Sequence, residues 1–129
     1  MFSHWEKTVL AEGVATDGTV VDASHVDLAI FSRGFQETYE LRRRIRVAFP
    51  DGSSTEFVAN VPLHQVQHLA DRRTIDCWPR LAEVTAIGAK VPVRYDKSNH
   101  SRIVLDLPAL VTSILAEADQ QSTAVEQEP

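Results

Sequence analysis

The sequence predicts a mainly β (α+β) fold: a small antiparallel barrel or sandwich of five or six strands, with short helices at the N-terminus, in the middle and at the C-terminus. Segments in which apolar and polar residues alternate recur along the chain, and turn sequences join two pairs of them. Other segments carry apolar residues at helical spacing. The 129 residues, 43% of them hydrophobic, supply one core of ordinary size. We therefore expect a single β-rich domain over residues 1–118.

The chain is expected to begin with a short amphipathic helix that has Ser3 as its N-cap and ends at Gly13. The apolar face of this helix consists of Phe2, Trp5, Val9 and Leu10. The β-rich stretch from Gly13 to about Ala23 predicts a first strand. After a break at 24–25, residues 26–31 offer a second strand.

The clearest element is a hairpin formed by residues 38–49 and 55–61. Apolar residues take one face of its first strand and charged residues take the other, although Arg43 interrupts this alternation. The sequence Pro-Asp-Gly-Ser at 50–53 is typical of a tight turn, because proline fixes φ and glycine accepts a positive φ. The helical spacing of Leu63, Val66 and Leu69 then predicts a helix of two or three turns.

Residues 71–87 could be short helix or loop, and the Trp78-Pro79 pair predicts an extended Trp78. A second hairpin follows, with strands over 90–95 and 103–107, and Pro92 indicates that its first strand lies at a sheet edge. A C-terminal helix is expected to open at Pro108. Its apolar stripe consists of Leu110, Val111, Ile114, Leu115 and Ala118. The polar residues 119–129 predict a disordered acidic tail.

Three segments resemble a known family. They are GVATDGTVV at 13–21, GAKVPVRYD at 88–96 and SRIVLD at 101–106. Together, over about residues 5–107, they resemble a small β domain of unknown function that recurs in actinobacterial proteins. The resemblance implies a strand that opens after a glycine and a hairpin that closes the fold, and it implies no catalytic residues. Some of these relatives carry membrane segments, and this chain departs from them because it has no segment of that kind.

Composition narrows the setting and the class of partner. Thirteen Lys and Arg against eighteen Asp and Glu give a net charge of −5, which argues against a globally basic nucleic-acid binder. A single cysteine cannot form an intramolecular disulfide, so we expect a reducing, cytoplasmic setting. No stretch approaches the roughly 18–20 apolar residues that cross a bilayer, so we expect no membrane span.

The common catalytic motifs are missing from the sequence. It contains no Gly-x-Ser-x-Gly elbow and no glycine-rich phosphate loop. His64 and His68 lie four residues apart, but Gln65 stands where a metalloprotease needs a glutamate base. Cys77 is expected to be a buried small hydrophobic residue rather than a nucleophile. We therefore expect no enzymatic activity, no catalytic residue, no cofactor and no bound metal.

Two candidate binding surfaces remain. Arg42, Arg44 and Arg46 project from one face of a strand at intervals of roughly 7 Å, close to the spacing of successive phosphates. Nearby glutamates, Glu37, Glu40 and Glu56, could neutralise part of this stripe. The C-terminal residues Leu110, Val111, Ile114 and Leu115 either pack over an open end of the domain or dock a partner.

The favoured interpretation is a non-catalytic interaction or scaffold module that binds another protein through a sheet edge or through the C-terminal helix. The alternative is a small barrel that binds single-stranded nucleic acid with the strand from Arg42 to Arg46. The sequence leaves the oligomeric state and the identity of the partner open.

Overall fold

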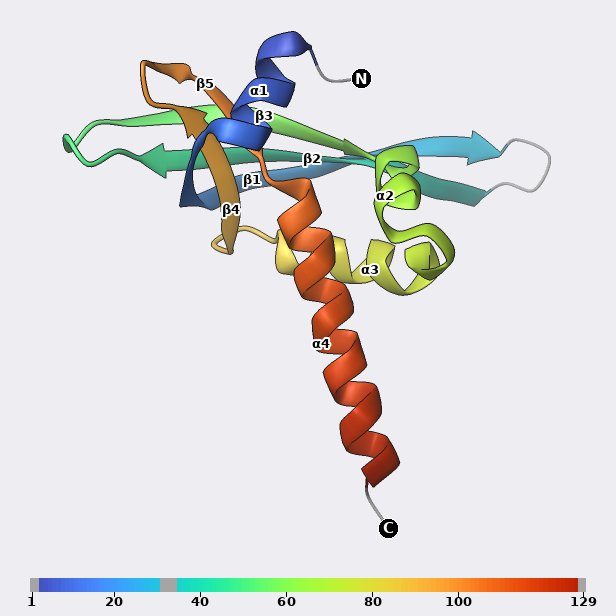
Figure 1. The fold of residues 1–129 in the computed structure, drawn as a ribbon. Helices are drawn as coiled ribbons and strands as arrows, with labels where there is room; N and C mark the ends of the chain where they lie inside the picture. The colour runs from blue at the N-terminus through green and yellow to red at the C-terminus, as the bar shows by residue number, and fades with distance from the viewer. Residues whose placement is uncertain (1–2, 31–34, 128–129) are drawn as a thin grey trace.

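The computed structural model describes residues 3–30 and 35–127, with side chains described for 3–26 and 39–120. Its antiparallel strands form one five-stranded sheet in the order β3-β2-β1-β4-β5. The elements are α1 (His4–Glu12), β1 (Val14–Ile30), β2 (Phe35–Ala48), β3 (Ser54–Pro62), α2 (Leu63–Ala70), the 3-10 helix η1 (Asp71–Arg73), α3 (Thr74–Val84), β4 (Lys90–Asp96), β5 (Asn99–Leu105) and α4 (Leu107–Gln127). The sheet curls into a nearly closed barrel, which confirms the predicted fold class (Figure 1).

The first helix begins where the sequence predicted it. The Ser3 N–H donates to Glu6 Oε1 at 3.0 Å, and the Glu6 N–H donates to Ser3 Oγ at 3.4 Å, so the two residues form a capping box. At the other end the Gly13 N–H donates to the Val9 carbonyl at 2.7 Å. A side chain on Gly13 would collide with that carbonyl oxygen, which explains the glycine at the passage from α1 into β1. Phe2, predicted on the apolar face of α1, lies outside the described residues.

The expected break after Ala23 is wrong, because β1 is one continuous strand up to Ile30. Its register against β2 shifts between Val20 and Asp22 and again between Val26 and Asp27. Such bulges insert an extra residue without ending a strand. The irregular sequence pattern of this region therefore reflects bulges within one strand, which bend β1 but do not divide it. Phe31 lies outside the described residues.

The hairpin of β2 and β3 is confirmed. The Phe49 N–H donates to the Ser53 carbonyl at 2.8 Å, and Gly52 supplies a positive φ of 89° in the turn. Asp51 Oδ1 accepts a hydrogen bond from the Ser53 N–H at 2.9 Å. Hydrogen bonds from the hydroxyl and the N–H of Ser53 hold the pKa of Asp51 below its usual range. α2 follows at Leu63, as the helical spacing predicted.

Two predictions based on proline are wrong. Trp78 is helical, because α3 runs through Pro79, which lacks only the hydrogen bond to the carbonyl of the highly exposed Ile75. Pro92 is not in an edge strand, because β4 lies between β1 and β5. The Pro92 carbonyl accepts from the Asp106 N–H at 2.9 Å. The N–H and C=O of a strand residue point to the same side of the strand. The N–H that Pro92 lacks would therefore point toward β5, at a place just beyond the last residue of that strand, Leu105.

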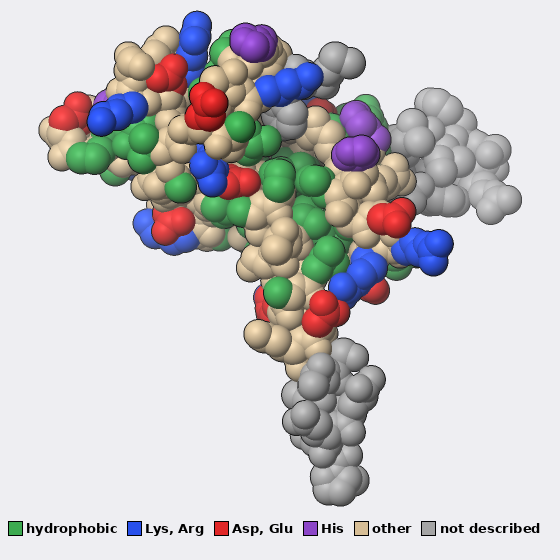
Figure 2. Space-filling model, in the orientation of Figure 1, with side chains coloured by type: hydrophobic (Ala, Val, Ile, Leu, Met, Phe, Trp, Pro, Cys, Tyr) green, Lys and Arg blue, Asp and Glu red, His purple; other side chains and the backbone are tan. Residues whose placement is uncertain are grey.

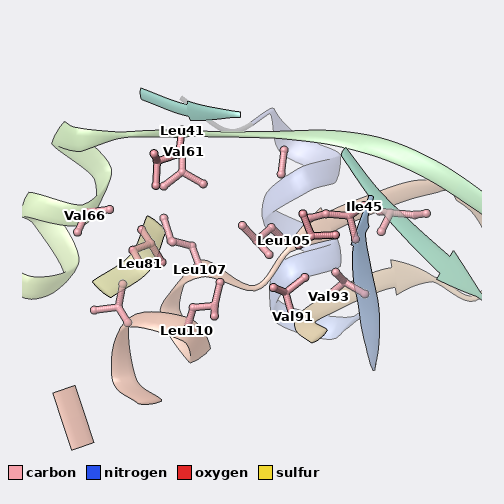
Figure 3. Packing of buried hydrophobic residues seen from close by; sticks show 14 of the residues in the cluster. Leu41, Ile45, Val61, Val66, Leu81, Val91, Val93, Leu105, Leu107 and Leu110 are labelled. Atoms are coloured by element: carbon pink, nitrogen blue, oxygen red, sulfur yellow. The ribbon is translucent and has the colours of Figure 1, made fainter. Parts of the chain in front are cut away.

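The core lies between the inner face of the sheet and the helices α2, α3 and α4 (Figure 3). Its largest fully buried side chains are Ile45, Leu81, Val20, Val47, Val66, Val91, Val93 and Cys77. α4 begins against this core and then extends away from the sheet (Figure 1). No helix in the part of the chain that the structure describes has the length and hydrophobicity needed to cross a membrane.

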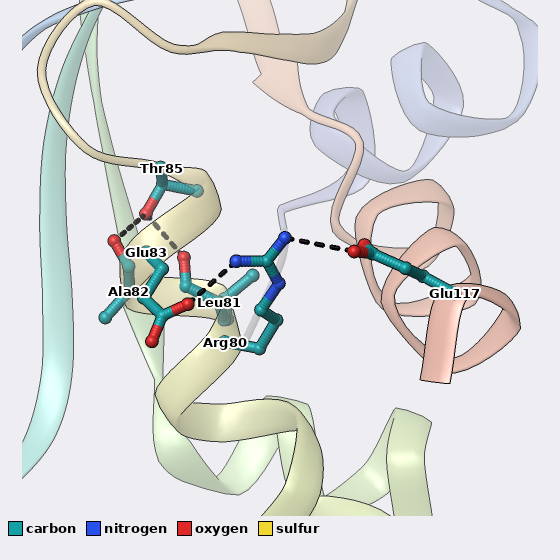
Figure 4. A network of polar contacts seen from close by, with 6 residues as sticks. All are labelled: Arg80, Leu81, Ala82, Glu83, Thr85 and Glu117. Atoms are coloured by element: carbon teal, nitrogen blue, oxygen red, sulfur yellow. Dashed lines mark hydrogen bonds and ion pairs between the residues drawn. The ribbon is translucent and has the colours of Figure 1, made fainter. Parts of the chain in front are cut away.

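The structure places residues 119–127, which the sequence analysis assigned to a disordered tail, in the helix α4. Alanine, glutamine and glutamate are good helix formers and can continue a helix that packing has already started. Two ion pairs fasten α4 to the preceding helices (Figure 4 shows the first): Arg80 Nη2 to Glu117 Oε1 at 3.1 Å, and Arg73 Nη2 to Asp119 Oδ1 at 2.9 Å.

Candidate functional site

A cleft lies at the seam between β3 and β5, the two edges of the sheet. Its volume is about 330 Å³. Its lining residues are Glu6 of α1, Glu40 of β2, Phe57, Val58, Ala59, Asn60, Val61 and Pro62 of β3, Gln65 of α2, Ile103, Val104 and Leu105 of β5, and Leu107 of α4. The floor of this cleft is therefore formed by two strand edges that are not paired with each other.

The edge of β3 that faces away from β2 is not paired with another strand. Phe49 and Ser53 form a hydrogen-bonded pair, and β3 keeps a regular register against β2 from there onward. Because bonded and non-bonded pairs alternate in an antiparallel ladder, the backbone groups of Glu56, Val58 and Asn60 point away from β2 and toward the seam. Pro62 is also at a position whose backbone groups point away from β2, so its missing N–H breaks no bond to β2.

The side chains along this edge leave it accessible. Val58 is 57% exposed, and Glu56 and Asn60 are exposed as well. β3 has no bulge, no lysine and no proline before its last residue. These are the devices by which natural sheets normally protect an edge from pairing with another chain.

On β5, the backbone groups that face the seam belong to residues whose side chains point inward, whereas on β3 they belong to residues whose side chains point outward. The bond from the Asp106 N–H to the Pro92 carbonyl defines the bonded pair at this end of the β4–β5 ladder. The alternation then turns the backbone groups of Leu105 and Ile103 toward the seam. Their side chains are buried on the inner face. These side chains therefore belong to the core, and β5 presents mainly its backbone to the cleft.

The charged side chains that line the cleft are acidic. Glu40 lies near the end of β3 and forms an ion pair with Arg42 at 3.3 Å, and Glu6 lies on α1. No lysine, arginine or histidine belongs to the lining formed by the described residues. The cleft therefore favours a neutral or positively charged occupant.

The structure places Arg42, Arg44 and Arg46 on the outward face of β2, as the alternation predicted. Arg46 Nη2 pairs with Glu56 Oε2 at 2.8 Å, and Arg42 Nε pairs with Glu40. Arg44 has no ion pair among the described residues. Its register partners are Asp22 on β1 and Val58 on β3. The side chain of Glu37, also expected near this stripe, lies outside the described residues.

The surroundings of these arginines offer little to a nucleic acid. The hollow beside them, of about 100 Å³, is lined by Asp22, Ser24, Arg42, Arg43, Arg44 and Val58, with no aromatic side chain. Figure 2 shows acidic and basic side chains interspersed on the visible face of the described residues, without a continuous basic surface. A stacking platform for bases is therefore missing from this hollow.

The candidate docking residues of the C-terminal helix belong to the core. Leu110, Val111 and Ile114 are 2–6% exposed, and Leu115 packs against them from a half-buried position. The reason is that α4 covers one side of the barrel with this stripe. Of the two readings that the sequence left open, packing over the domain is the one observed. These residues are not available to dock a partner.

The residues singled out for metal or thiol chemistry are dispersed. His64 and His68 are exposed on α2, and no group of three or more His, Cys, Asp or Glu side chains could hold a metal within the described ranges. Cys77 is fully buried in the core, as predicted, and burial raises the pKa of its thiol. A buried thiol with a raised pKa is a poor nucleophile.

No family model, no curated protein and no solved structure matches this chain. The resemblance to an actinobacterial β domain therefore stays a prediction.

Sequence reasoning missed the role of Arg43 and missed the cleft. Arg43 is 6% exposed on the inner side of β2. Its Nε donates to the carbonyl and the hydroxyl of Thr85 at 2.8 and 3.0 Å, and its Nη1 donates to the carbonyls of Ser24 and Arg42 at 2.7 and 2.9 Å. Thr85 is the C-cap of α3, where the helix dipole favours a positive charge. The sequence signal for this buried role was the charged residue Arg43 itself, at a position where the alternation along β2 calls for an apolar residue.

Proposed function

We propose that this protein is a non-catalytic protein-interaction module that captures an extended segment of a partner protein at the edge of β3. The observation that supports this proposal most directly is the cleft at the β3–β5 seam, where the unpaired edge of β3 carries the exposed side chains of Glu56, Val58 and Asn60. Pairing an added strand with a free sheet edge is a common mode of peptide recognition. We place the module in the cytoplasm, in keeping with its single, buried cysteine.

The chemistry of the cleft suits binding better than catalysis. Its side chains are apolar or amide groups together with two carboxylates, Glu6 and Glu40. Glu6 is held in the capping box of α1 and Glu40 is paired with Arg42. Neither carboxylate lies beside a nucleophile or a base in that lining. Backbone pairing supplies affinity without any of these side chains reacting.

The proposal is tested with a displayed library of random ten-residue peptides, selected on the native protein and counter-selected on a Val58→Pro variant. The Val58 N–H faces the seam, so proline there removes a donor from the cleft and leaves the β2–β3 ladder intact. We expect peptides that bind the native protein and a Val58→Ala control but lose binding to the proline variant.

A second measurement keeps this test independent of how well the proline variant folds. Amide hydrogen exchange of the native protein is followed with and without a selected peptide. We expect exchange at Glu56, Val58 and Asn60 to slow when the peptide binds. Equal binding to all three proteins, or protection confined to α4, would overturn the proposal.

The alternative, a barrel that binds single-stranded nucleic acid, draws its support from Arg44, which has no ion pair within the described residues. Two of the three arginines are already paired, so we expect no binding of labelled single-stranded RNA or DNA in a fluorescence titration at low salt. Salt-dependent binding that is lost when Arg42, Arg44 and Arg46 are all changed to Ser would establish the alternative instead.

A further inference from the structure

Val58 lies between two hollows of opposite charge. Its side chain is 57% exposed, and it lines both the cleft at the β3–β5 seam and the smaller hollow over β1 and β2, the arginine hollow. The charged side chains of the cleft are Glu6 and Glu40, whereas Arg42 and Arg44 line the arginine hollow. A partner that covers Val58 therefore meets carboxylates in one hollow and guanidinium groups in the other.

The two carboxylates of the cleft each have an oxygen left for a further hydrogen bond. Among the described residues, Glu6 accepts only through Oε1, from the Ser3 N–H, and Glu40 accepts only through Oε2, from Arg42 Nε. The Glu40 side chain is 21% exposed, so solvent screens its charge less than that of a fully exposed carboxylate. The cleft, of about 330 Å³, is at the small end of the range for ligand sites, about 300–1,000 Å³. Its volume and charge suit one long basic side chain.

The arginine hollow offers a cation to the same partner. Arg44 is exposed and forms no ion pair within the part of the chain that the structure describes. Its register partner Asp22 accepts instead from the Ala23 N–H, at 2.9 Å. Neighbouring strands lie about 4.8 Å apart, so the backbone of Arg44 is about 10 Å from a segment bound at the edge of β3. The side chains of an arginine and a glutamate bridge that distance together.

From this arrangement we propose that the partner segment places an apolar residue over Val58, a basic side chain in the cleft beside Glu6 and Glu40, and a carboxylate on Arg44. This proposal rests on the proposed function and specifies the chemistry of the partner. Arginine suits the cleft better than lysine, because its planar guanidinium carries five donors and can bond to two carboxylates at once. A segment with the basic and the acidic residue exchanged is disfavoured, because like charges would then meet in both hollows.

The test repeats the selection of ten-residue peptides on the native protein, on a Glu6→Gln/Glu40→Gln double variant and on Arg44→Gln. Glutamine at position 6 retains the capping box of α1, because it serves there as well as glutamate does. Arg46→Gln is the matched control, since Arg46 lies on the same face of β2 but is paired with Glu56. We expect enrichment of arginine on every protein except the double variant, and enrichment of acidic residues on every protein except Arg44→Gln.

A binding measurement then isolates the charge of the basic residue. The leading peptide from the native protein is resynthesised with citrulline in place of its arginine, which keeps the shape of the side chain and removes its charge. Isothermal titration calorimetry is expected to show about tenfold weaker binding to the native protein. The same replacement is expected to change binding to the double variant by less than about twofold, because the carboxylates are absent there.

The outcomes separate this inference from the proposed function. Selected peptides without these charged residues, or an equal effect of citrulline on the native protein and the double variant, would show that the inference is wrong. The proposed function would still stand on the loss of binding to Val58→Pro. If the native protein selects no peptide, both fail. Light scattering that finds a dimer, dissociated by Val58→Asp, would show that a second copy of the chain covers Val58 and would overturn the inference.

Discussion

Replacing Ile45 with alanine is expected to lower the free energy of unfolding by about 2–5 kcal/mol. Ile45 is fully buried in β2, between Val20 on β1 and Phe57 on β3. The substitution removes its contacts on both sides and leaves a cavity that a rigid sheet cannot fill by collapse. Urea denaturation followed by circular dichroism measures the change. The milder Ile45→Val is expected to cost about 0.5–1.5 kcal/mol.

Gly18 provides the matched control for this prediction. An ideal Cβ on Gly18 would lie 2.5 Å from Ile45 Cγ2, so Gly18→Ala overpacks the same place and is expected to cost about 1–3 kcal/mol in the native background. In the Ile45→Ala background that methyl group is gone, and the cost of Gly18→Ala should fall. Strictly additive effects in this double-mutant cycle would contradict the packing described for β1 and β2.

Changing Arg43 to methionine is expected to lower the free energy of unfolding by about 3 kcal/mol, because the carbonyls of Thr85 and Ser24 lose their donor in a buried place. Burial lowers the pKa of Arg43, and the group is stabilised by these acceptors rather than by a carboxylate among the described residues. Lysine cannot reproduce the fork of donors, so Arg43→Lys should restore only part of the loss.

The neighbouring Arg44 offers the control for Arg43. It has the same residue type, one position along β2, but its side chain is exposed and has no ion pair within the described residues. Arg44→Met is expected to change stability by less than about 0.5 kcal/mol. Thermal and urea unfolding of both variants compare the two positions directly. Equal effects at the two positions would mean that the contacts of Arg43 contribute nothing.

Local patterns predicted the parts of the fold that local physics determines. The alternation along β2 and the turn at 50–53 specify a hairpin by themselves, and the spacing of Leu63, Val66 and Leu69 specifies α2. The patterns failed where a neighbour outweighed a local preference. Pro79 is accommodated in α3 because its lost bond lies on an exposed side, and Pro92 is accommodated in β4 because β5 ends beside it.

The candidate site depends on long-range pairing, which explains why the sequence did not indicate it. The common face of Arg42, Arg44 and Arg46 follows from a period of two along one strand. The cleft exists only because β1 pairs with β4, across more than half of the chain, and so leaves β3 and β5 as the two edges. No periodicity within β3 distinguishes an edge from an interior strand.

The length and direction of α4 have a practical consequence for experiments on the cleft. Its 21 residues, at about 1.5 Å each, span about 30 Å, and Figure 1 shows that they lead away from the sheet and from β5. A fluorophore or a surface linker attached beyond Gln127 therefore sits far from the β3–β5 seam. Immobilisation through that end presents the seam to solution, whereas attachment near Ser3 places the linker beside α1 and its Glu6.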